Sequence, residues 1–119
     1  MGKSVLLVDD SRLSRMMISK ELAGLDLDIR EASGGQEGID LYKEQKADIV
    51  FLDLTMPDMD GFETLENLLQ IDPDAKVVIL TADVQSGSTN RALEMGAVDV
   101  MNKPSKREEF EAVLEKSLS

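Results

Sequence analysis

The stretch Phe51-Leu52-Asp53-Leu54-Thr55-Met56-Pro57-Asp58-Met59-Asp60-Gly61 decides how the rest of the chain is interpreted, because an apolar run ends there on a carboxylate. A loop containing proline and glycine follows, as is typical where a strand leads into a helix. A buried carboxylate without a partner is strongly disfavoured, so Asp53 must meet other polar groups. Two further apolar runs, at residues 5–8 and 77–80, also end on polar side chains.

Strand and helix patterns alternate along the whole chain. Strands are predicted at residues 5–8, 25–30, 48–52, 76–80 and 97–101, and helices are predicted to begin at Ser11, Gln36, Phe62, Ala92 and Ser105. Short connections between such elements require parallel strands joined by right-handed crossovers. The strand at 25–30 alternates between apolar and polar residues, which favours the edge of the sheet.

These features predict an α/β protein with a flavodoxin-like (βα)5 fold. The expected sheet is doubly wound, parallel and five-stranded, with strand order 2-1-3-4-5. We expect residues 1–119 to form a single domain, since the chain has 119 residues and no linker or repeat interrupts the pattern.

Two local predictions concern helix ends and helix faces. Ser11 is expected to cap the first helix, and Ser105 with Glu108 resembles a capping box at the last one. The apolar face of the first helix is predicted to consist of Leu13, Met16, Met17 and Leu22. The Met16-Met17 pair is interpreted as part of the core rather than as a binding surface.

Composition excludes several classes of function. The formal net charge of −11 argues against nucleic-acid binding, which needs a concentrated basic surface. The absence of cysteine and histidine excludes disulfides, thiolate metal sites and imidazole catalysis. No apolar stretch reaches the roughly 18 residues of a membrane span, and the N-terminus does not resemble a signal peptide, so a cytoplasmic protein is expected.

Three carboxylates are predicted to meet at one edge of the sheet. In the expected strand order the first and third strands end side by side, which brings Asp9 and Asp10 next to Asp53. A hard divalent cation is the natural way to keep such a cluster ionised, and Mg2+ suits an all-oxygen ligand set. We expect Asp10 and Asp53 to bind Mg2+ directly, Asp9 to bind through water, and the backbone carbonyl of Thr55 to contribute a further ligand.

Donors for a phosphoryl group are expected beside this cluster. Thr81 and Lys103 follow the fourth and fifth strands, and Pro104 restricts the loop after Lys103, with a cis peptide bond as one way to aim the lysine inward. A hydroxyl and an ammonium facing a carboxylate and a metal suit the oxygens of a phosphoryl group. No glycine-rich phosphate loop follows the first strand, which argues against a nucleotide, so Asp53 is predicted to be a nucleophile toward a phosphoryl donor.

This set of motifs resembles the receiver domain of two-component response regulators, the CheY-like family. The resemblance is carried by Asp9-Asp10, Asp53 with the loop 56–61, Thr81-Ala82 and Lys103-Pro104, and it covers essentially the whole chain. It implies a stand-alone receiver that accepts a phosphoryl group on Asp53 from the phosphohistidine of a sensor histidine kinase, with Mg2+ required. Pro57, Gly61 and Pro104 would shape the loops of the site.

The resemblance also implies how the signal leaves the domain. Thr81 would turn toward the phosphoryl group and Lys103 would pair with it, while the face formed by the fourth helix, fifth strand and fifth helix changes its affinity for a downstream protein. The chain would not be an enzyme beyond self-phosphorylation from a phosphodonor and slow autodephosphorylation, and a separate phosphatase is allowed for. It would act as a monomer or weak dimer, without nucleic-acid or membrane partners.

One position departs from the family pattern. The family usually has an aromatic switch residue three positions before the lysine, where this chain has Val100. A valine cannot swing between exposed and buried positions as an aromatic ring does, so signalling here is expected to use Thr81 and loop movement. Thr55 and Asp83 resemble the variable positions that tune dephosphorylation.

Other interpretations remain open at this level. Asp9-Asp10 and Thr81 also fit turns or helix caps, and Lys103 fits a surface lysine. A Mg2+-dependent phosphatase of the haloacid dehalogenase type is the main alternative, although Asp53-Leu54-Thr55 lacks its second aspartate. A flavin carrier is disfavoured by the missing phosphate loop. Within the receiver family, a chemotaxis regulator, a phosphorelay intermediate and a regulator of another enzyme are all compatible with a single domain.

Overall fold

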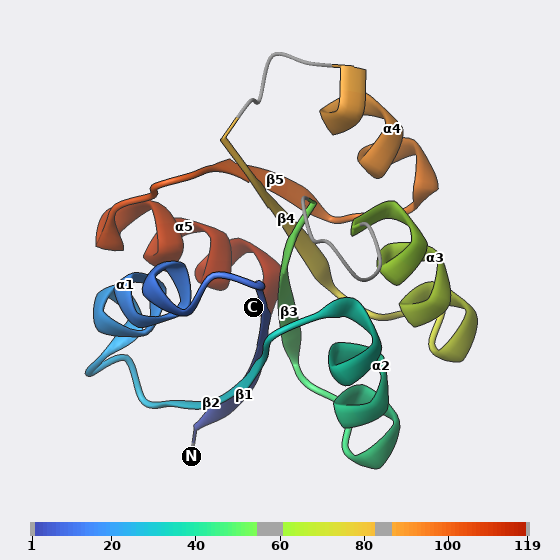
Figure 1. Ribbon diagram of the computed structural model, residues 1–119. Helices are drawn as coiled ribbons and strands as arrows, with labels where there is room; N and C mark the ends of the chain where they lie inside the picture. The colour runs from blue at the N-terminus through green and yellow to red at the C-terminus, as the bar shows by residue number, and fades with distance from the viewer. Residues whose placement is uncertain (1, 55–60, 83–86, 119) are drawn as a thin grey trace.

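A computed structural model of the chain describes residues 2–54, 61–82 and 87–118. Strands and helices alternate along it (Figure 1): β1 (Lys3–Val8), α1 (Arg12–Leu22), β2 (Leu27–Ala32), α2 (Gly35–Glu44), β3 (Ile49–Asp53), α3 (Gly61–Ile71), β4 (Val77–Thr81), α4 (Gly87–Met95), β5 (Asp99–Asn102) and α5 (Arg107–Leu118). The pattern predicted from the sequence, five strands and five helices in alternation, is confirmed.

The strands form one sheet in the order β2-β1-β3-β4-β5, and all neighbouring pairs are parallel. This is the predicted flavodoxin-like order, with the alternating strand β2 at an edge. The pairing places Val8 beside Leu52 and Asp53 beside Leu80, so the C-terminal ends of the central strands lie level with one another. Polar residues that follow these strands are therefore delivered to one edge of the sheet.

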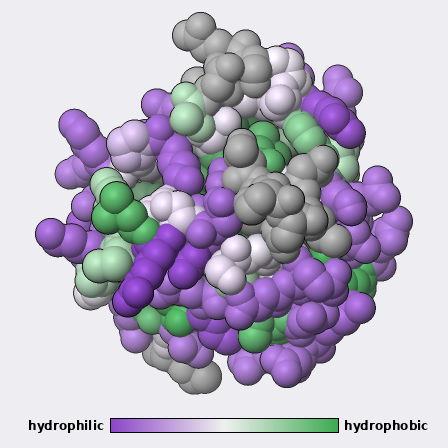
Figure 2. All heavy atoms as spheres, viewed as in Figure 1, coloured by the Kyte–Doolittle hydropathy of each residue, from purple (hydrophilic) through white to green (hydrophobic). Residues whose placement is uncertain are grey.

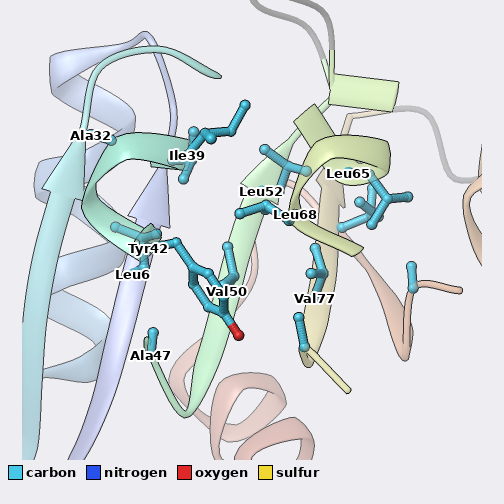
Figure 3. Close-up of a cluster of buried hydrophobic side chains, with 14 of the residues drawn as sticks. Leu6, Ala32, Ile39, Tyr42, Ala47, Val50, Leu52, Leu65, Leu68 and Val77 are labelled. Atoms are coloured by element: carbon cyan, nitrogen blue, oxygen red, sulfur yellow. The ribbon is translucent and has the colours of Figure 1, made fainter. Parts of the chain in front are cut away.

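Helices cover both faces of the sheet. On one face α1 and α5 bury Ile18, Leu22, Phe110 and Leu114 against β1, β3 and β4, and the rings of Phe51 and Phe110 meet edge to face with centroids 5.4 Å apart. On the other face α2, α3 and α4 cover a second cluster, in which Tyr42 projects from α2 over the sheet near Val50 (Figure 3). Each central strand is buried on both sides because its residues contribute alternately to the two clusters.

The boundaries of all five strands differ from the prediction by one or two residues. For the second and fifth strands the backbone shows the cause. The second strand was predicted at 25–30 but begins at Leu27, because Gly24 and Asp26 have positive φ angles and the Leu25 amide is held by the Leu22 carbonyl. The fifth was predicted at 97–101 but spans Asp99–Asn102, because the Ala97 amide still bonds to the end of α4.

Helix α4 is longer than predicted. It begins at Gly87 rather than near Ala92, so residues 87–91, interpreted as part of a polar loop or left unassigned, are helical. Only Ala92 of this helix is fully buried. A helix with so narrow a buried face leaves a weak hydrophobic period in the sequence, which explains the short prediction.

The predicted apolar face of α1 was wrong in three of its four members. Leu22 is buried together with Ile18, but Leu13, Met16 and Met17 are 67%, 60% and 49% exposed. Ile18 and Leu22 lie one turn apart on the face that meets the sheet, whereas the other three lie on the opposite side of the helix. Figure 2 shows the resulting hydrophobic surface over α1 within a mostly hydrophilic exterior.

Helix caps were predicted with mixed success. Ser11 caps α1 as expected, since its hydroxyl accepts the Ser14 amide at 3.1 Å. The capping box at Ser105 and Glu108 was wrong: the Ser105 hydroxyl donates to the Asn102 carbonyl, and Glu109 accepts the Lys106 amide at 3.0 Å. The cap is therefore displaced by one residue, which is a typical uncertainty at helix ends.

Two carboxylates at the edge where the strands begin, half-buried Asp72 and exposed Asp48, are well provided with hydrogen-bond donors. Asp72 accepts the Tyr42 hydroxyl at 2.7 Å and the Asp74 amide at 3.0 Å, and the Tyr42 bond is the main reason that the pKa of Asp72 is lowered. Burial, followed by the bond to Asp72, raises the pKa of Tyr42. Asp48 accepts the backbone amide and hydroxyl of Ser4, and the amide bond is the main cause of its lowered pKa.

No helix among the described residues is long and apolar enough to cross a membrane.

Candidate phosphoryl-acceptor site

The candidate site lies where the strands end. Asp9 and Asp10 follow β1, Asp53 is the last residue of β3, Thr81 is the last residue of β4, and Lys103 follows β5. Because these strands are parallel and adjacent, four segments that are distant in the sequence meet at one edge of the sheet. The convergence follows from the strand order alone.

Asp9 is completely buried and both of its carboxylate oxygens are hydrogen-bonded. Oδ1 accepts the Ser11 amide at 2.9 Å, while Oδ2 accepts the Ser14 hydroxyl at 2.6 Å and the Lys103 ammonium at 2.7 Å. Burying a carboxylate is strongly unfavourable unless it is paired and hydrogen-bonded, and Asp9 meets both conditions. The two oxygens are thus held in fixed directions.

The backbone around Asp9 is fixed by α1 and by the sheet edge. The Asp9 amide donates to the Ala32 carbonyl at 3.1 Å, and the Arg15 guanidinium donates to the Asp9 carbonyl at 2.6 Å. Arg15 also bonds to Glu31 at 3.1 Å. The first turn of α1 therefore holds Asp9 at two places, since Arg15 bonds to its backbone carbonyl and Ser14 bonds to its carboxylate.

Lys103 connects the two buried carboxylates. Its ammonium lies 2.7 Å from Asp9 Oδ2 and 3.7 Å from Asp53 Oδ2, and its side chain is 23% exposed. The Lys103 amide donates to the Thr81 carbonyl at 2.8 Å, which joins the ends of β4 and β5. The Lys103–Pro104 peptide bond is cis, as the sequence suggested.

The carboxylates of Asp9, Asp10 and Asp53 have oxygens within 4.8 Å of one another. Asp10 is exposed, whereas Asp53 is 6% exposed and has Lys103 beside it. A cluster with only oxygen donors and one solvent-facing member suits Mg2+, which keeps several waters and takes few direct carboxylates. The residues present therefore fit the predicted cofactor.

Gly61 fixes the return of the chain to the site. Its amide donates to the Leu54 carbonyl at 2.9 Å, and a Cβ atom at this position would lie 2.4 Å from Leu54 Cα. Only glycine permits so close an approach of α3 to the residue after Asp53. Thr55, Pro57 and Asp83, which the sequence also assigned to the site, lie outside the described residues.

Val100 lies in the middle of β5, where it pairs with Ile79 and packs partly buried against the cluster under α2, α3 and α4. It is thus part of the sheet beside α4 rather than of the carboxylate cluster.

Two residues of the site were missed by the sequence interpretation. Ser14 bonds to Asp9 Oδ2 and Arg15 to the Asp9 carbonyl, both from the first turn of α1. The available signal was their spacing, since residues one turn after the cap Ser11 face the same strand end as the cap. Which of them would reach Asp9 depends on the rotation of α1.

The sequence matches the response regulator receiver domain family over residues 5–115. The chain therefore belongs to this family, and it is CheY-like. Over 105 residues it is 39% identical to the chemotaxis protein CheY of Thermotoga maritima, covering 87% of this chain and 88% of that protein. Over 114 residues it is 40% identical to the chemotaxis protein CheY of Listeria monocytogenes, covering 95% of this chain and 96% of that protein.

Solved structures agree with the fold. A CheX–CheY–BeF3–Mg2+ complex from Borrelia burgdorferi contains a chain that matches with a TM-score of 0.89 and 30% identity, covering 96% of this chain and 88% of that one. A chemotaxis protein CheY from Vibrio cholerae matches with a TM-score of 0.91, covering 98% of this chain and 99% of that one. Its identity of 24% supports the fold alone.

Proposed function

We propose that this receiver domain is a phosphorylation switch in two-component signalling and that Asp53 accepts the phosphoryl group from the phosphohistidine of a sensor histidine kinase. The observation that carries the proposal is the meeting of Asp9, Asp10 and Asp53 within 4.8 Å, with Lys103 3.7 Å from Asp53. Such a cluster is poorly suited to stability and well suited to binding a cation and a phosphoryl group.

The transfer would use a carboxylate oxygen of Asp53 as the nucleophile. A P–O bond forms to Asp53 while the P–N bond to the kinase histidine breaks, and the electron pair of that bond stays on the imidazole nitrogen. Lys103 is close enough to provide positive charge for the phosphoryl oxygens after a short movement away from Asp9.

Mg2+ would be held by Asp10 and Asp53 directly and by Asp9 through water. This assignment for Asp9 is supported by its hydrogen bonds, since both of its oxygens already accept protein donors. Bound Mg2+ would supply positive charge and keep the transferring oxygens in line. The carbonyl of Thr55 remains our candidate for a further ligand.

The output would be a change in affinity for a downstream protein through the face formed by α4, β5 and α5. The similarity to proteins named chemotaxis protein CheY favours a chemotaxis pathway. The Borrelia relative was solved in complex with CheX, which supports a protein partner here as well. The physical reason is that an added phosphoryl dianion beside movable donors biases an element with two conformations. Because Val100 is not aromatic, Thr81 and loop movement would transmit the change to this face. The protein would act in the cytoplasm.

A phosphatase of the haloacid dehalogenase type is the alternative that shares most of these residues. It would need an aspartate two positions after the nucleophile to act as an acid, and this chain has Thr55 there. We therefore propose no turnover beyond self-phosphorylation and slow autodephosphorylation, with Thr55 and Asp83 tuning the latter and a separate phosphatase allowed for.

Labelling with a small phosphodonor tests the proposal. Acetyl phosphate with Mg2+ should phosphorylate the wild-type protein, which intact-mass spectrometry would detect as one added phosphoryl group. Asp53→Asn and addition of EDTA should each abolish the labelling. Asp48→Asn, which changes a carboxylate at the opposite edge of the sheet, should label normally. Undiminished labelling of Asp53→Asn would contradict the assignment, and steady hydrolysis of p-nitrophenyl phosphate would favour the phosphatase.

A further inference from the structure

We infer that Ser14 is a positioning residue of the phosphoryl-acceptor site, whose hydroxyl keeps Asp9 Oδ2 hydrogen-bonded when Lys103 moves away. Ser14 Oγ and Lys103 Nζ lie 2.6 Å and 2.7 Å from this one oxygen. The role of Ser14 toward a phosphoryl group rests on the function proposed above. That Ser14 and Lys103 both donate to Asp9 Oδ2 does not depend on it.

The burial of Asp9 makes the number of its donors important. The residue has no exposed surface, so water cannot replace a donor that leaves. Oδ1 has the Ser11 amide, while Oδ2 has Ser14 and Lys103. If Ser14 lost its hydroxyl, Oδ2 would depend on Lys103, and movement of the lysine would take away the remaining described donor of a buried carboxylate oxygen.

Lys103 is placed to make such a movement. Its ammonium is 1.0 Å closer to Asp9 than to Asp53, the difference between 3.7 and 2.7 Å, and its side chain is partly exposed. A phosphoryl group on Asp53 would add negative charge on the far side of the lysine and attract it. Ser14 lowers the free-energy cost of this shift because one strong donor stays on Asp9.

The position of the Ser14 hydroxyl is fixed before any phosphorylation. The Ser14 amide donates to the Ser11 cap, and the neighbouring Arg15 holds the Asp9 carbonyl at 2.6 Å. The first turn of α1 thus presents the hydroxyl to Asp9 without a conformational search. A hydroxyl carries no charge, so it can stabilise Asp9 without competing for the phosphoryl group as a second lysine would.

A purely structural role for Ser14, as a local bond that anchors α1, gives a different expectation. In that case the loss caused by Ser14→Ala would be independent of Lys103. If the two donors substitute for each other on Asp9, removing both must cost more than the sum of the separate losses.

A double-mutant cycle in Mg2+-free buffer distinguishes these cases. Urea unfolding would be measured for the wild type, Ser14→Ala, Lys103→Met and the double variant. Each variant is characterised by the factor by which it increases the unfolding equilibrium constant over the wild type. We expect this factor for the double variant to exceed the product of the factors for the two single variants by about fivefold. Ser19→Ala in place of Ser14→Ala is the control, because Ser19 Oγ is buried on the same helix without a hydrogen-bond partner among the described residues. Additive losses for Ser14 and Lys103 would overturn the inference.

The role of Ser14 toward the phosphoryl group is tested by the binding of fluoroberyllate, which mimics that group in the presence of Mg2+. Ser14→Ala should weaken the affinity of the protein for this mimic about fivefold by isothermal titration calorimetry, which is the size of the net contribution of one typical hydrogen bond. Ser14→Thr, which keeps a hydroxyl, should restore most of the affinity, and Ser19→Ala should leave it unchanged. Equal affinity of Ser14→Ala and wild type would refute the positioning role. Failure of the wild type to bind the mimic or to be labelled would instead refute the proposed function, while the unfolding cycle would still report on the shared donors.

Discussion

The two edges of the sheet treat their carboxylates in opposite ways. Where the strands begin, Asp72 and Asp48 accept neutral hydroxyl and amide donors, and the pKa of each is lowered. Where the strands end, Asp9, Asp10 and Asp53 gather within 4.8 Å, and one lysine pairs with two of them. The first edge stabilises the fold, whereas the second keeps an unbalanced charge that a cation or a phosphoryl group can use.

Removing a lysine from each edge should show the contrast most strongly. Lys103→Met is expected to lower the free energy of unfolding by about 3 kcal/mol without Mg2+, because it leaves Asp9 buried without a countercharge. Lys46→Met, which breaks a 3.6 Å pair between a 65% exposed lysine and Asp72, should cause no measurable loss. Urea unfolding of both variants gives the comparison, and equal losses would show that the two edges do not differ.

Tyr42→Phe probes the edge where the strands begin. Loss of the hydroxyl bond to Asp72 should lower the free energy of unfolding by about 1.5 kcal/mol at pH 7. Because the pKa of Asp72 is lowered in the folded protein, its contribution is complete above the unfolded pKa of about 4 and is lost as the pH falls through the folded value. The gap between wild type and variant should therefore narrow between pH 4 and pH 2.

The difference in the free energy of unfolding between wild type and Tyr42→Phe should also change in alkali, because Tyr42 itself titrates there. The pKa of Tyr42 is raised, so the phenol stays protonated through its ordinary pKa of about 10 and the contribution is lost only as the pH rises toward the folded value. Urea midpoints measured from pH 2 to pH 10 would test the loss in acid and the constancy of the gap up to the ordinary pKa of tyrosine. A gap that is constant down to pH 2 would show that the bond to the Asp72 carboxylate is not what the variant removes.

Asp53→Asn probes the edge where the strands end and should have the smallest effect on stability, with the opposite sign. Removing one of three adjacent negative charges should raise the free energy of unfolding by about 1 kcal/mol in Mg2+-free buffer, because it relieves repulsion between carboxylates a few Å apart. The same measurement with saturating Mg2+ should remove the gain or reverse it, because the variant loses a proposed ligand. A variant less stable than wild type without Mg2+ would mean that Lys103 fully balances the cluster.

The sequence was sufficient to predict the strand order and the convergence of Asp9, Asp53 and Lys103. Continuous apolar runs marked the buried strands and an alternating run marked the edge, and the parallel order then placed the polar residues after each strand together. These predictions depend on topology, which a chain of this size leaves little freedom to change.

Features that depend on the rotation of a helix were not predictable in the same way. Met16 and Met17 looked like core residues, and Ser14 looked like an ordinary helix residue, until the face of α1 carrying Ile18 was seen to meet the sheet. A similar limit applies to Asp9 and Asp10. The two are identical in type and adjacent in sequence, but the first is fully buried among donors and the second is exposed.

The pairing of Lys103 with Asp9 spans 94 positions of the chain, which has a consequence for synthesis on the ribosome. β1, β2 and β3 are neighbours in the sheet and are complete by Asp53, so a nascent chain can assemble them before β5 has emerged. Such an intermediate already contains the three carboxylates but not their lysine, and the face later covered by α5 is still open to solvent. Arrival of the last strand and helix therefore completes the charge balance and the core together.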